Sequence, residues 1–240
     1  MFPSSSDDEF DRNHQNNPRR RRRIFRERIN TEFESIVQFN ERFRMSHENL
    51  ELLLNDIGHF LRRATNRSMA LSEKMQLCAA LHWLGTGTHY HAVGDMHGIS
   101  KASVYRAVHK VVEAVVRIKF PQVVTWPENV VDVVERFHMI AGFPQVIGCV
   151  DGTLIKIDAP TQNELNYVDR HGNHSLNCMV VCGPDLSFYY VSARWPGSVN
   201  DVLRNSSLYR RMEEGWRPVP GAVILGDSIY PLNQPKQPAF

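Results

Sequence analysis

The sequence predicts an α/β protein in which a helical region precedes a strand-rich region. From Asn30 to Phe120 the apolar residues recur at helical spacing, and from Gln145 they fall in short continuous or alternating runs that are typical of strands. Strands followed by a helix and another strand indicate an α/β sheet. A chain of 240 residues with 42% apolar residues is long enough for one large or two modest domains.

Residues 1–29 are predicted to be a disordered tail with acidic and basic segments. The tail is polar, lacks periodicity and contains five consecutive arginines, Arg19 to Arg23. It cannot bury enough apolar surface to offset the entropy cost of ordering. The arginine run fits a nuclear-import signal, a flexible arm on DNA or a solvated charge run, and the sequence leaves all three open.

The helical region is predicted over residues 30–120. Ser46 and Ser72 are expected to cap its second and third helices, because a serine hydroxyl accepts hydrogen bonds from the first turn. Gly85 is expected to end the third helix. The apolar stripes that predict the first two helices consist of Phe33, Ile36, Val37 and Phe43, and of Leu50, Leu53, Leu54, Ile57, Phe60 and Leu61.

A helix-turn-helix pattern follows within this region. Tyr90 to His97 is predicted to be a short helix, Gly98 and Ile99 a turn, and Ser100 the cap of a longer helix. In DNA-binding proteins of this kind the second helix offers its N-terminal residues to the major groove. A plain αα-hairpin with a basic exposed face fits the pattern equally well. The candidate DNA-binding residues are Lys101, Ser103, Arg106 and Lys110.

Residues 128–240 are predicted to form the strand-rich domain, after a linker at 121–127 that contains two prolines. A helix over 128–140 comes first, and strands follow at 145–150 and 154–157. A hairpin is predicted from the runs 175–182 and 187–193 around the turn Gly183-Pro184-Asp185. A helix over 200–212 and a short strand over 222–225 complete the domain.

Three aspartates stand in glycine-containing signatures near the ends of strand-like runs. They are Asp151 in GCVDGT (148–153), Asp201 in PGSVND (196–201) and Asp227 in LGDSIYP (225–231). Carboxylates at strand ends are a usual way to hold a divalent metal for phosphodiester chemistry, because Mg²⁺ prefers hard oxygen ligands. Taken singly, each aspartate also fits a turn or a helix cap.

These signatures resemble the DDE core of PIF/Harbinger transposases, and most closely their domesticated, transposase-derived nucleases. NYVDR (166–170), HSLN (174–177) and WPGS (195–198) stand in the same order and spacing, and the likeness extends from about Arg44 to about Leu232. The resemblance implies an RNase H-like mixed sheet preceded by a helix-turn-helix. Leu154 departs from the family, in which many relatives carry His at this position.

The resemblance also implies roles for the three aspartates. The family's catalytic aspartates fall on Asp151 and Asp201, its Gly-Asp signature places a third metal ligand at Asp227, and a later glutamate completes the site for Mg²⁺ or Mn²⁺. Only thirteen residues follow Asp227, and Leu232 to Phe240 contains no acidic residue. We therefore expect an incomplete, truncated RNase H-like sheet and impaired cleavage, because each group that stabilises a transferring phosphate contributes strongly to the rate.

The function predicted in this way is a metal-dependent nuclease that cleaves DNA phosphodiester bonds. The alternative is a non-enzymatic DNA-binding or adaptor protein that retains the transposase fold. The first 120 residues carry 19 Lys and Arg against 14 Asp and Glu, and the last 120 carry 9 against 12, which favours DNA contact by the first half. The resemblance further implies a Myb-like DNA-binding partner and a nuclear location, with the cytoplasm as a second location.

Several other classes of protein are not favoured. No run approaches the roughly 18 apolar residues of a membrane span, and an acidic, Ser-rich N-terminus is unlike a signal peptide. The four cysteines show no C-x-x-C spacing, so neither a disulfide framework nor a zinc cage is predicted. His171 and His174 lack the accompanying ligands that a zinc site requires.

Overall fold

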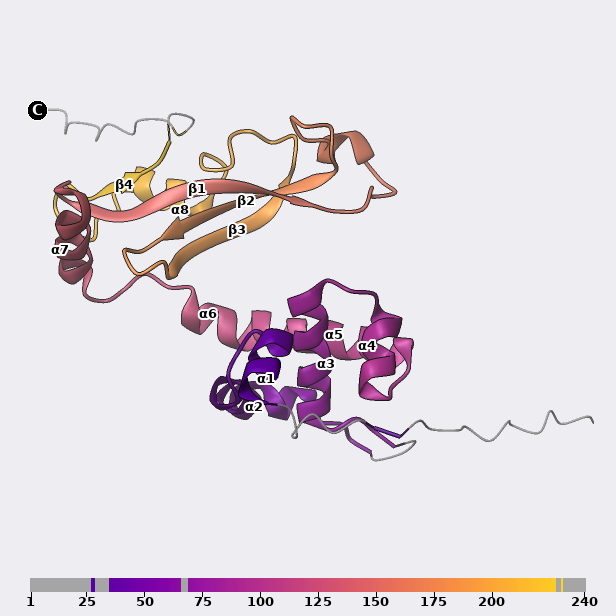
Figure 1. Cartoon of the computed structure of the whole chain (residues 1–240). Helices are drawn as coiled ribbons and strands as arrows, with labels where there is room; N and C mark the ends of the chain where they lie inside the picture. Colours follow the sequence, from indigo (N-terminus) through magenta and orange to yellow (C-terminus); the bar gives the residue numbers. More distant parts are fainter. Residues whose placement is uncertain (1–26, 29–34, 66–68, 228–229, 231–240) are drawn as a thin grey trace, which may run out of the picture. The chain divides into compact units, whose positions relative to one another are not determined.

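The computed structural model describes residues 27–28, 35–65, 69–227 and 230 (Figure 1). The predicted tail up to residue 26, with its arginine run, and Phe33 lie outside the described residues. The chain divides into two compact units. The first comprises Met1–Leu54 and Leu61–Lys110, and the second comprises Asn55–Phe60 and Val111–Phe240.

The first unit is helical, as the spacing of the apolar residues predicts. Ser46, Ser72 and Ser100 each accept a hydrogen bond of 3.2 Å from the backbone N–H three residues further on, so the predicted serine caps are confirmed. The prediction that Gly85 ends the third helix was wrong, because the helix continues to Thr86 and Gly87 caps it in the left-handed conformation. The helices to which the unit contributes are α1 (Ile36–Phe43), α2 (His47–Leu61), α3 (Glu73–Thr86), α4 (Tyr90–His97) and α5 (Lys101–Ala114).

The core of the first unit differs from the predicted stripe of α1. Phe39 and Phe43 are both 1% exposed and lie with ring centroids 4.5 Å apart. Ile36 and Val37, which were expected to face inward, are 73% and 66% exposed. The prediction was wrong at these two positions because the buried face of a two-turn helix is chosen by its neighbour, here α3, and not by spacing alone.

A buried histidine pair joins α3 to α4. Nδ1 of His82 lies 3.0 Å from Nε2 of His97, and the two side chains are almost inaccessible. Burial, helped by the nearby His82 and Arg42, lowers the pKa of His97 to about 4. His97 is therefore neutral at neutral pH, which allows one ring nitrogen of the pair to donate and the other to accept.

The turn between α4 and α5 has the predicted form. Gly98 ends α4 with φ 65°, a conformation that glycine adopts without strain, and α5 begins two residues after Ile99. The side chain of a residue at Gly94 would lie 2.7 Å from the carbonyl oxygen of Ile99, so the turn packs closely on α4. These features suit a helix-turn-helix and an αα-hairpin equally.

From Val111 onward the second unit contains the end of α5, a π-helical stretch, Val115–Lys119, and then α6 (Phe120–Val123). After the predicted linker, α7 covers Val130–Ala141, close to the predicted 128–140. The Asn129 side chain accepts from the Asp132 N–H to cap it, and Gly142 ends it with φ 72°.

The described residues of the second unit form a mixed sheet of order β3-β2-β1-β4 (Figure 1). The strands are β1 (Val146–Lys156), β2 (Ser175–Cys182), β3 (Phe188–Pro196) and β4 (Val223–Leu225), with α8 (Ser207–Glu213) between β3 and β4. β1, β2 and β3 pair antiparallel, whereas β4 runs parallel to β1. The predicted α/β fold with a mixed sheet is confirmed, and its arrangement is consistent with an RNase H-like fold.

β1 is one continuous strand, whereas two strands were predicted on either side of Asp151 and Gly152. The pair Asp-Gly is common in turns, but here the ladder with β2 runs unbroken from Cys149 to Lys156. On its other side β1 pairs with β4 only from Val146 to Cys149. Among the residues that the structure describes, no strand pairs with the second half of β1 on the side of β4, and we call this its open edge.

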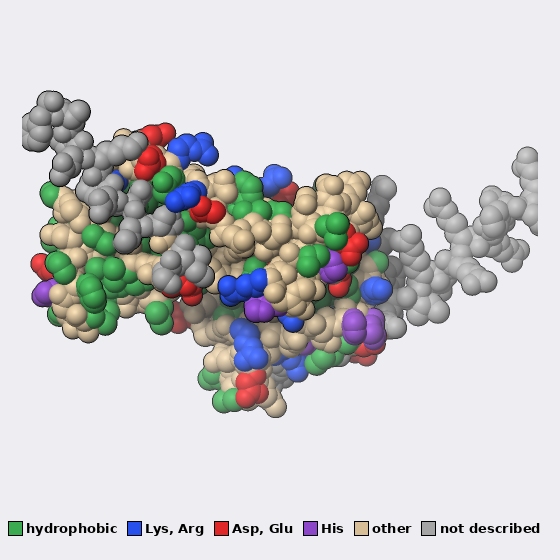
Figure 2. Space-filling view, turned by 90° about the horizontal axis from the view of Figure 1, so that it is seen from above, with side chains coloured by type: hydrophobic (Ala, Val, Ile, Leu, Met, Phe, Trp, Pro, Cys, Tyr) green, Lys and Arg blue, Asp and Glu red, His purple; other side chains and the backbone are tan. Residues whose placement is uncertain are grey.

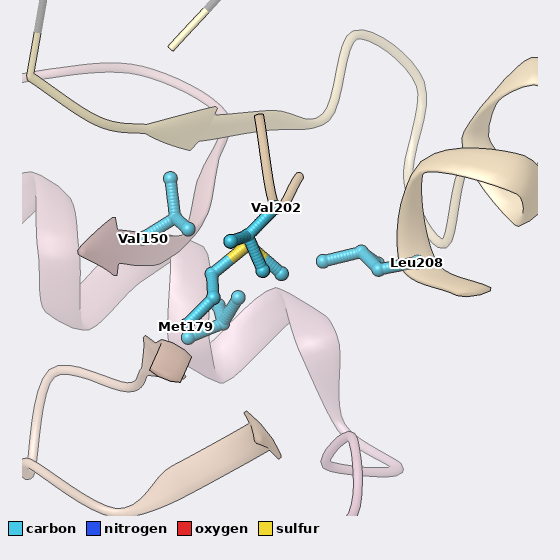
Figure 3. Packing of buried hydrophobic residues seen from close by; sticks show 5 residues of the cluster. Val150, Met179, Val202 and Leu208 are labelled. Atoms are coloured by element: carbon cyan, nitrogen blue, oxygen red, sulfur yellow. The ribbon is translucent and has the colours of Figure 1, made fainter. Parts of the chain in front are cut away.

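One face of the sheet carries the core of the second unit. Val150, Met179 and Val181 project from β1 and β2, and they pack with Val202 and Leu208 (Figure 3). Val202 lies between the sheet residues and Leu208 of α8, and it is 4% exposed. The burial of Val202 holds the segment between β3 and α8 against the sheet, because moving this side chain out of the core would lose its packing contacts.

Part of the apolar surface of α7 remains uncovered. Val133 is buried, whereas Met139 and Ile140 are 77% and 67% exposed. Figure 2 shows hydrophobic side chains gathered at the end of the molecule where Figure 1 places α7. Within the described ranges, none of the helices combines the length and the apolar character needed to cross a membrane.

Candidate active site

The three predicted aspartates line one cavity of about 300 Å³ in the second unit. The cavity contains backbone and side chains from β1, β2, the two loops that follow β1 and β3, and the segment after β4. The residues that line it are Asp151, Gly152, Thr153, Leu154, Arg170, Asn177, Gly197, Asn200, Asp201, Val202, Leu203, Asp227 and Tyr230.

Asp151 lies in the middle of β1 and not at a strand end as the sequence suggested. It is nevertheless exposed, and the described pairing of β1 with β4 ends at Cys149, two residues before it. Its Oδ1 accepts a hydrogen bond of 2.7 Å from the Gly152 N–H. The open strand edge gives a ligand access to this carboxylate.

Asp227 is brought beside Asp151 by the parallel register of β1 and β4. Leu225 pairs with Cys149. Asp151 follows Cys149 by two residues, and Asp227 follows Leu225 by two residues. Since neighbouring strands lie about 4.8 Å apart, this register brings the two chain segments to adjacent positions, and both aspartates line the same cavity. Both aspartates also raise the pKa of Tyr230, as expected if all three groups lie close together.

Asp201 approaches the cavity from the loop after β3. The burial of its neighbour Val202 anchors it there. Its Oδ1 accepts from the Arg204 N–H at 3.1 Å, and its Oδ2 lies 3.3 Å from Arg204 Nε. The carboxylate therefore orders the turn before α8. The helix that was predicted from residue 200 begins only at Ser207, after this turn.

These positions suit a hard divalent cation only in part. Carboxylates from Asp151, Asp201 and Asp227 and the amide oxygen of Asn177 are the ligand types that Mg²⁺ takes in proteins. In the part of the chain that the structure describes, however, no three His, Cys, Asp or Glu side chains converge closely enough to hold one ion. Mg²⁺ commonly uses one or two carboxylates with waters and substrate phosphate, so two of these side chains would be enough for one ion.

Tyr230 was not among the predicted site residues, although it lies in the same signature as Asp227. Burial and the charges of Asp151 and Asp227 raise the pKa of its phenol to about 12. A side chain at Gly152 would lie 3.1 Å from its hydroxyl oxygen, and one at Gly226 would lie 2.7 Å from its ring. The two glycines thus leave the space that Tyr230 occupies beside the carboxylates.

Arg170 and Asn177 also line the cavity and were not predicted as site residues. The Asn177 amide donates to the Val199 backbone oxygen at 2.8 Å, and so connects β2 to the loop that carries Asp201. Arg170 follows Asp169, which is only 7% exposed. Arg170 lies in NYVDR (166–170) and Asn177 lies in HSLN (174–177), two motifs on which the sequence resemblance rests, and this was the signal that could have identified them.

The candidate DNA-binding residues of α5 have different surroundings. Lys101 and Arg106 are exposed, and Ser103 is partly buried near the Ser100 cap. Lys110 donates to the backbone oxygens of Leu61 at 2.9 Å and Arg62 at 3.3 Å. These bonds satisfy carbonyls at the end of α2, so Lys110 has a structural role whether or not it also meets DNA.

His174 lies against an acidic side chain, and the cysteines are not joined by disulfides. His174 Nε2 lies 2.9 Å from Glu164 Oε1, so its partner is a carboxylate in the described structure. The four cysteines are free thiols. Cys149 and Cys182 face each other directly across β1 and β2, and burial raises the pKa of both.

A mixed sheet with acidic side chains at an open strand edge is the arrangement expected of a DDE-type nuclease domain. Residues 150–238 match the family described as DDE superfamily endonuclease. This part of the chain belongs to that superfamily. The match contains Asp151, Asp201 and Asp227, the three positions that the sequence signatures single out.

The relatives with known names narrow the comparison to a transposase-derived group. The chain is 38% identical over 200 residues to the Rattus norvegicus protein named "Putative nuclease HARBI1", and 37% identical over 200 residues to its Homo sapiens counterpart. Each match covers 78% of this chain and 56% of the relative. The Arabidopsis thaliana "Protein ALP1-like" is 30% identical over 177 residues, which is 68% of this chain and 43% of that protein.

The chain thus spans little more than half the length of the HARBI1 relatives it matches. No solved structure matches it. The similarity to HARBI1 confirms the resemblance to domesticated Harbinger-type nucleases, and it extends well beyond the family match into the helical part of the chain.

Proposed function

We propose that the protein is a metal-dependent nuclease that cleaves DNA phosphodiester bonds, with Asp151, Asp201 and Asp227 as metal ligands. The observation that carries the proposal is the shared cavity of these three aspartates at the open edge of β1, inside the segment that matches DDE endonucleases. The names of the HARBI1 relatives support the same class of reaction.

Asp151 and Asp227 are the ligands on which this function depends most. Their adjacent positions on β1 and after β4 allow both carboxylates to face one cation. Asp201 is exposed enough to join them, but it now pairs with Arg204, so its participation requires the guanidinium to give way. When bound, Mg²⁺ or Mn²⁺ activates a water molecule and neutralises charge on the phosphate.

Other residues of the cavity would order the substrate around this pair. Tyr230 is a protonated phenol at physiological pH, as its ordinary pKa already ensures and its raised pKa reinforces, so it can donate a hydrogen bond to a carboxylate or phosphate oxygen. Gly197 packs so tightly that a side chain there would meet the Ser175 hydroxyl and the Tyr167 carbonyl. This packing holds the loop before Asp201 close to β2.

Metal binding and cleavage can be tested on the same variants. We expect Asp151→Asn to weaken Mn²⁺ binding measured by calorimetry, and to slow nicking of supercoiled plasmid by about a hundredfold or more. Asp158→Asn is the matched control, because Asp158 follows the same strand, is exposed and does not line the cavity. Equal nicking by the wild type and Asp151→Asn, with unchanged Mn²⁺ affinity, would refute the proposal.

A second function, DNA binding without catalysis, is favoured by one observation. Lys101 and Arg106 are exposed on the first half of α5, directly after the turn that Gly98 makes possible. In a helix-turn-helix this surface enters the major groove, and its basic residues also neutralise phosphates. As a proposal, the same chain could therefore bind DNA through α5 while its cavity is inactive.

The two functions separate experimentally. If α5 binds DNA, neutralising Lys101 and Arg106 together should weaken binding of a labelled duplex and reduce its salt dependence, whereas Asp151→Asn should leave both unchanged. Arg63→Gln is the control, since Arg63 is an exposed arginine of the first unit that lies outside α4 and α5. Undiminished binding by the double variant would exclude α5 as the contact.

The location and the partner belong to the same proposal. A nuclear protein with a Myb-like DNA-binding partner would agree with the resemblance to Harbinger-type proteins and with the arginine run at residues 19–23. Fusing the chain to a fluorescent protein, with and without these five arginines, tests the location. Equal distribution of the two fusions between nucleus and cytoplasm would contradict an import signal in this run.

A further inference from the structure

Among the described residues that line the cavity, Arg170 supplies the one basic side chain beside the carboxylates. The geometry points to Arg170 as a phosphate-binding residue that holds the backbone of a nucleic-acid strand beside Asp151. This inference rests on the proposed nuclease function and adds to it the group that recognises the substrate. The sequence motifs alone do not identify Arg170 as a site residue, because the chemistry was predicted from the aspartates as metal ligands.

A rigid loop presents Arg170. The buried carboxylate of Asp169 accepts from the His171 N–H at 2.8 Å and the Asn173 N–H at 3.0 Å. The Asp169 N–H donates back to the Asn173 oxygen at 2.8 Å, and Val168 forms a β-bridge with His174. These bonds close the loop on itself, so the backbone at Arg170 is ordered before any ligand binds.

The same loop is bound to the one that carries Asp201. The Ser198 hydroxyl donates to the Asn166 oxygen at 2.6 Å, and the Gly197 N–H donates to the Ser175 oxygen at 2.8 Å. Arg170 and Asp201 therefore stand on two loops that are fixed to each other. A preorganised arginine loses less conformational entropy on binding than one on a mobile loop, which strengthens its contact with an anion.

The guanidinium is oriented for an external ligand. Its Nε donates to His171 Nε2 at 3.2 Å, which leaves the edge formed by the two terminal nitrogens for other acceptors. Within the described ranges, Arg170 makes no ion pair with a carboxylate, although it is exposed in a cavity that holds three. Arginine matches two phosphate oxygens at once, and this geometry distinguishes it from lysine.

A nucleic-acid strand is the ligand that this combination of charges favours. A free phosphate would be repelled by three nearby carboxylates, whereas a strand reaches the cavity with one phosphodiester and distributes its remaining contacts along the surface. Arg170 then offsets part of the repulsion at the phosphate nearest the carboxylates. Its role is to bind and position the substrate, and the carboxylates remain the metal ligands.

The test compares DNA binding by Arg170→Gln with that of Arg194→Gln in the full chain. Arg194 is exposed on β3 and does not line the cavity, so its substitution removes the same charge from the same unit. Binding of a labelled single-stranded oligonucleotide is measured by fluorescence anisotropy in Ca²⁺, with inorganic phosphate as a competitor. We expect Arg170→Gln to weaken binding about tenfold or more, Arg170→Lys to weaken it less, and Arg194→Gln to change it little.

The salt dependence gives an independent measure. Loss of one phosphate contact should reduce the slope of log affinity against log salt by about 0.7 for a single strand, and only for Arg170→Gln, because Arg170→Lys keeps the positive charge. Equal affinities and slopes for Arg170→Gln and Arg194→Gln would overturn the inference. If the wild type nicks plasmid while these variants bind alike, only the role of Arg170 fails. If the wild type neither binds nor nicks, the inference and the proposed function both fail.

Discussion

Replacing Gly226 by alanine is expected to destabilise the second unit and to displace Tyr230 from the cavity. Gly226 lies between Leu225, the last residue of β4, and Asp227. An alanine Cβ there would lie 2.7 Å from Tyr230 Cδ2 and 2.8 Å from Val150 Cγ1. Carbon atoms in favourable contact are about 3.5–4.0 Å apart, so each neighbour would have to move by about 1 Å.

The two neighbours differ in how easily they can move. Val150 is 5% exposed and packs in the core cluster, so it has little room. Tyr230 is only partly buried and can rotate away from the added methyl group. Overpacking of this kind costs about 1–3 kcal/mol, and we expect about 2 kcal/mol for Gly226→Ala. Combining it with Tyr230→Ala should recover part of this loss, since one of the two clashes is then removed.

The free energy of unfolding in urea, followed by tryptophan fluorescence, tests this prediction, because Trp126 and Trp216 lie against the core of the same unit. Gly152→Ala is the matched control, since its Cβ would meet only the tip of Tyr230, at 3.1 Å from the hydroxyl oxygen. We expect the control to cost less than about 1 kcal/mol. A Gly226→Ala protein as stable as the wild type would refute the packing argument.

Three further outcomes are expected. Lys110→Met should lower the free energy of unfolding in urea by about 1 kcal/mol, because the Arg62 oxygen loses the Lys110 donor and the Leu61 oxygen keeps only Gln76 Nε2. An equal loss in Lys101→Met would contradict this reason. Oxidised glutathione at alkaline pH should form a disulfide between Cys149 and Cys182, because directly opposed strand residues have Cα atoms about 4.5–5.5 Å apart. Peptide mass mapping checks this, and any other cysteine pairing would contradict the strand register. Stability should fall as the pH drops from 6.5 towards 4, because His97 binds a proton in the unfolded chain in this range while the folded histidine stays neutral. Acid titration followed by circular dichroism checks this. An equal decline in a His97→Gln variant would argue against it.

Local interactions explain what could be predicted about the fold. The Ser46, Ser72 and Ser100 caps depend on an oxygen and an N–H three residues apart, so they can be recognised without knowledge of the rest of the molecule. The bounds of α4 and β2 were predicted correctly for the same reason, since a glycine or a clear change of pattern stands at their ends. The signatures around Asp151 and Asp227 also identified the superfamily.

Contacts distant in sequence explain the errors. Asp151 and Gly152 have the composition of a turn, but pairing with β2 extends β1 through them. Ile36 and Val37 fit a helical stripe, but the packing of α1 buries Phe39 and Phe43 instead. In both cases a local preference of a few tenths of a kcal/mol is smaller than the free energy of pairing or burial that tertiary structure supplies.

The sequence by itself determined the class of fold, the acidic positions and the family, because helix periodicity, capping and ordered motifs are properties of neighbouring residues. Only the tertiary structure decided that Asp151 lies at an open strand edge, that Arg170 and Tyr230 enter its cavity, and that Lys110 is bound to α2. These facts depend on strand register and on loops that meet across tens of residues. A side chain's partners at such distances follow from the folded backbone, and no local pattern specifies them.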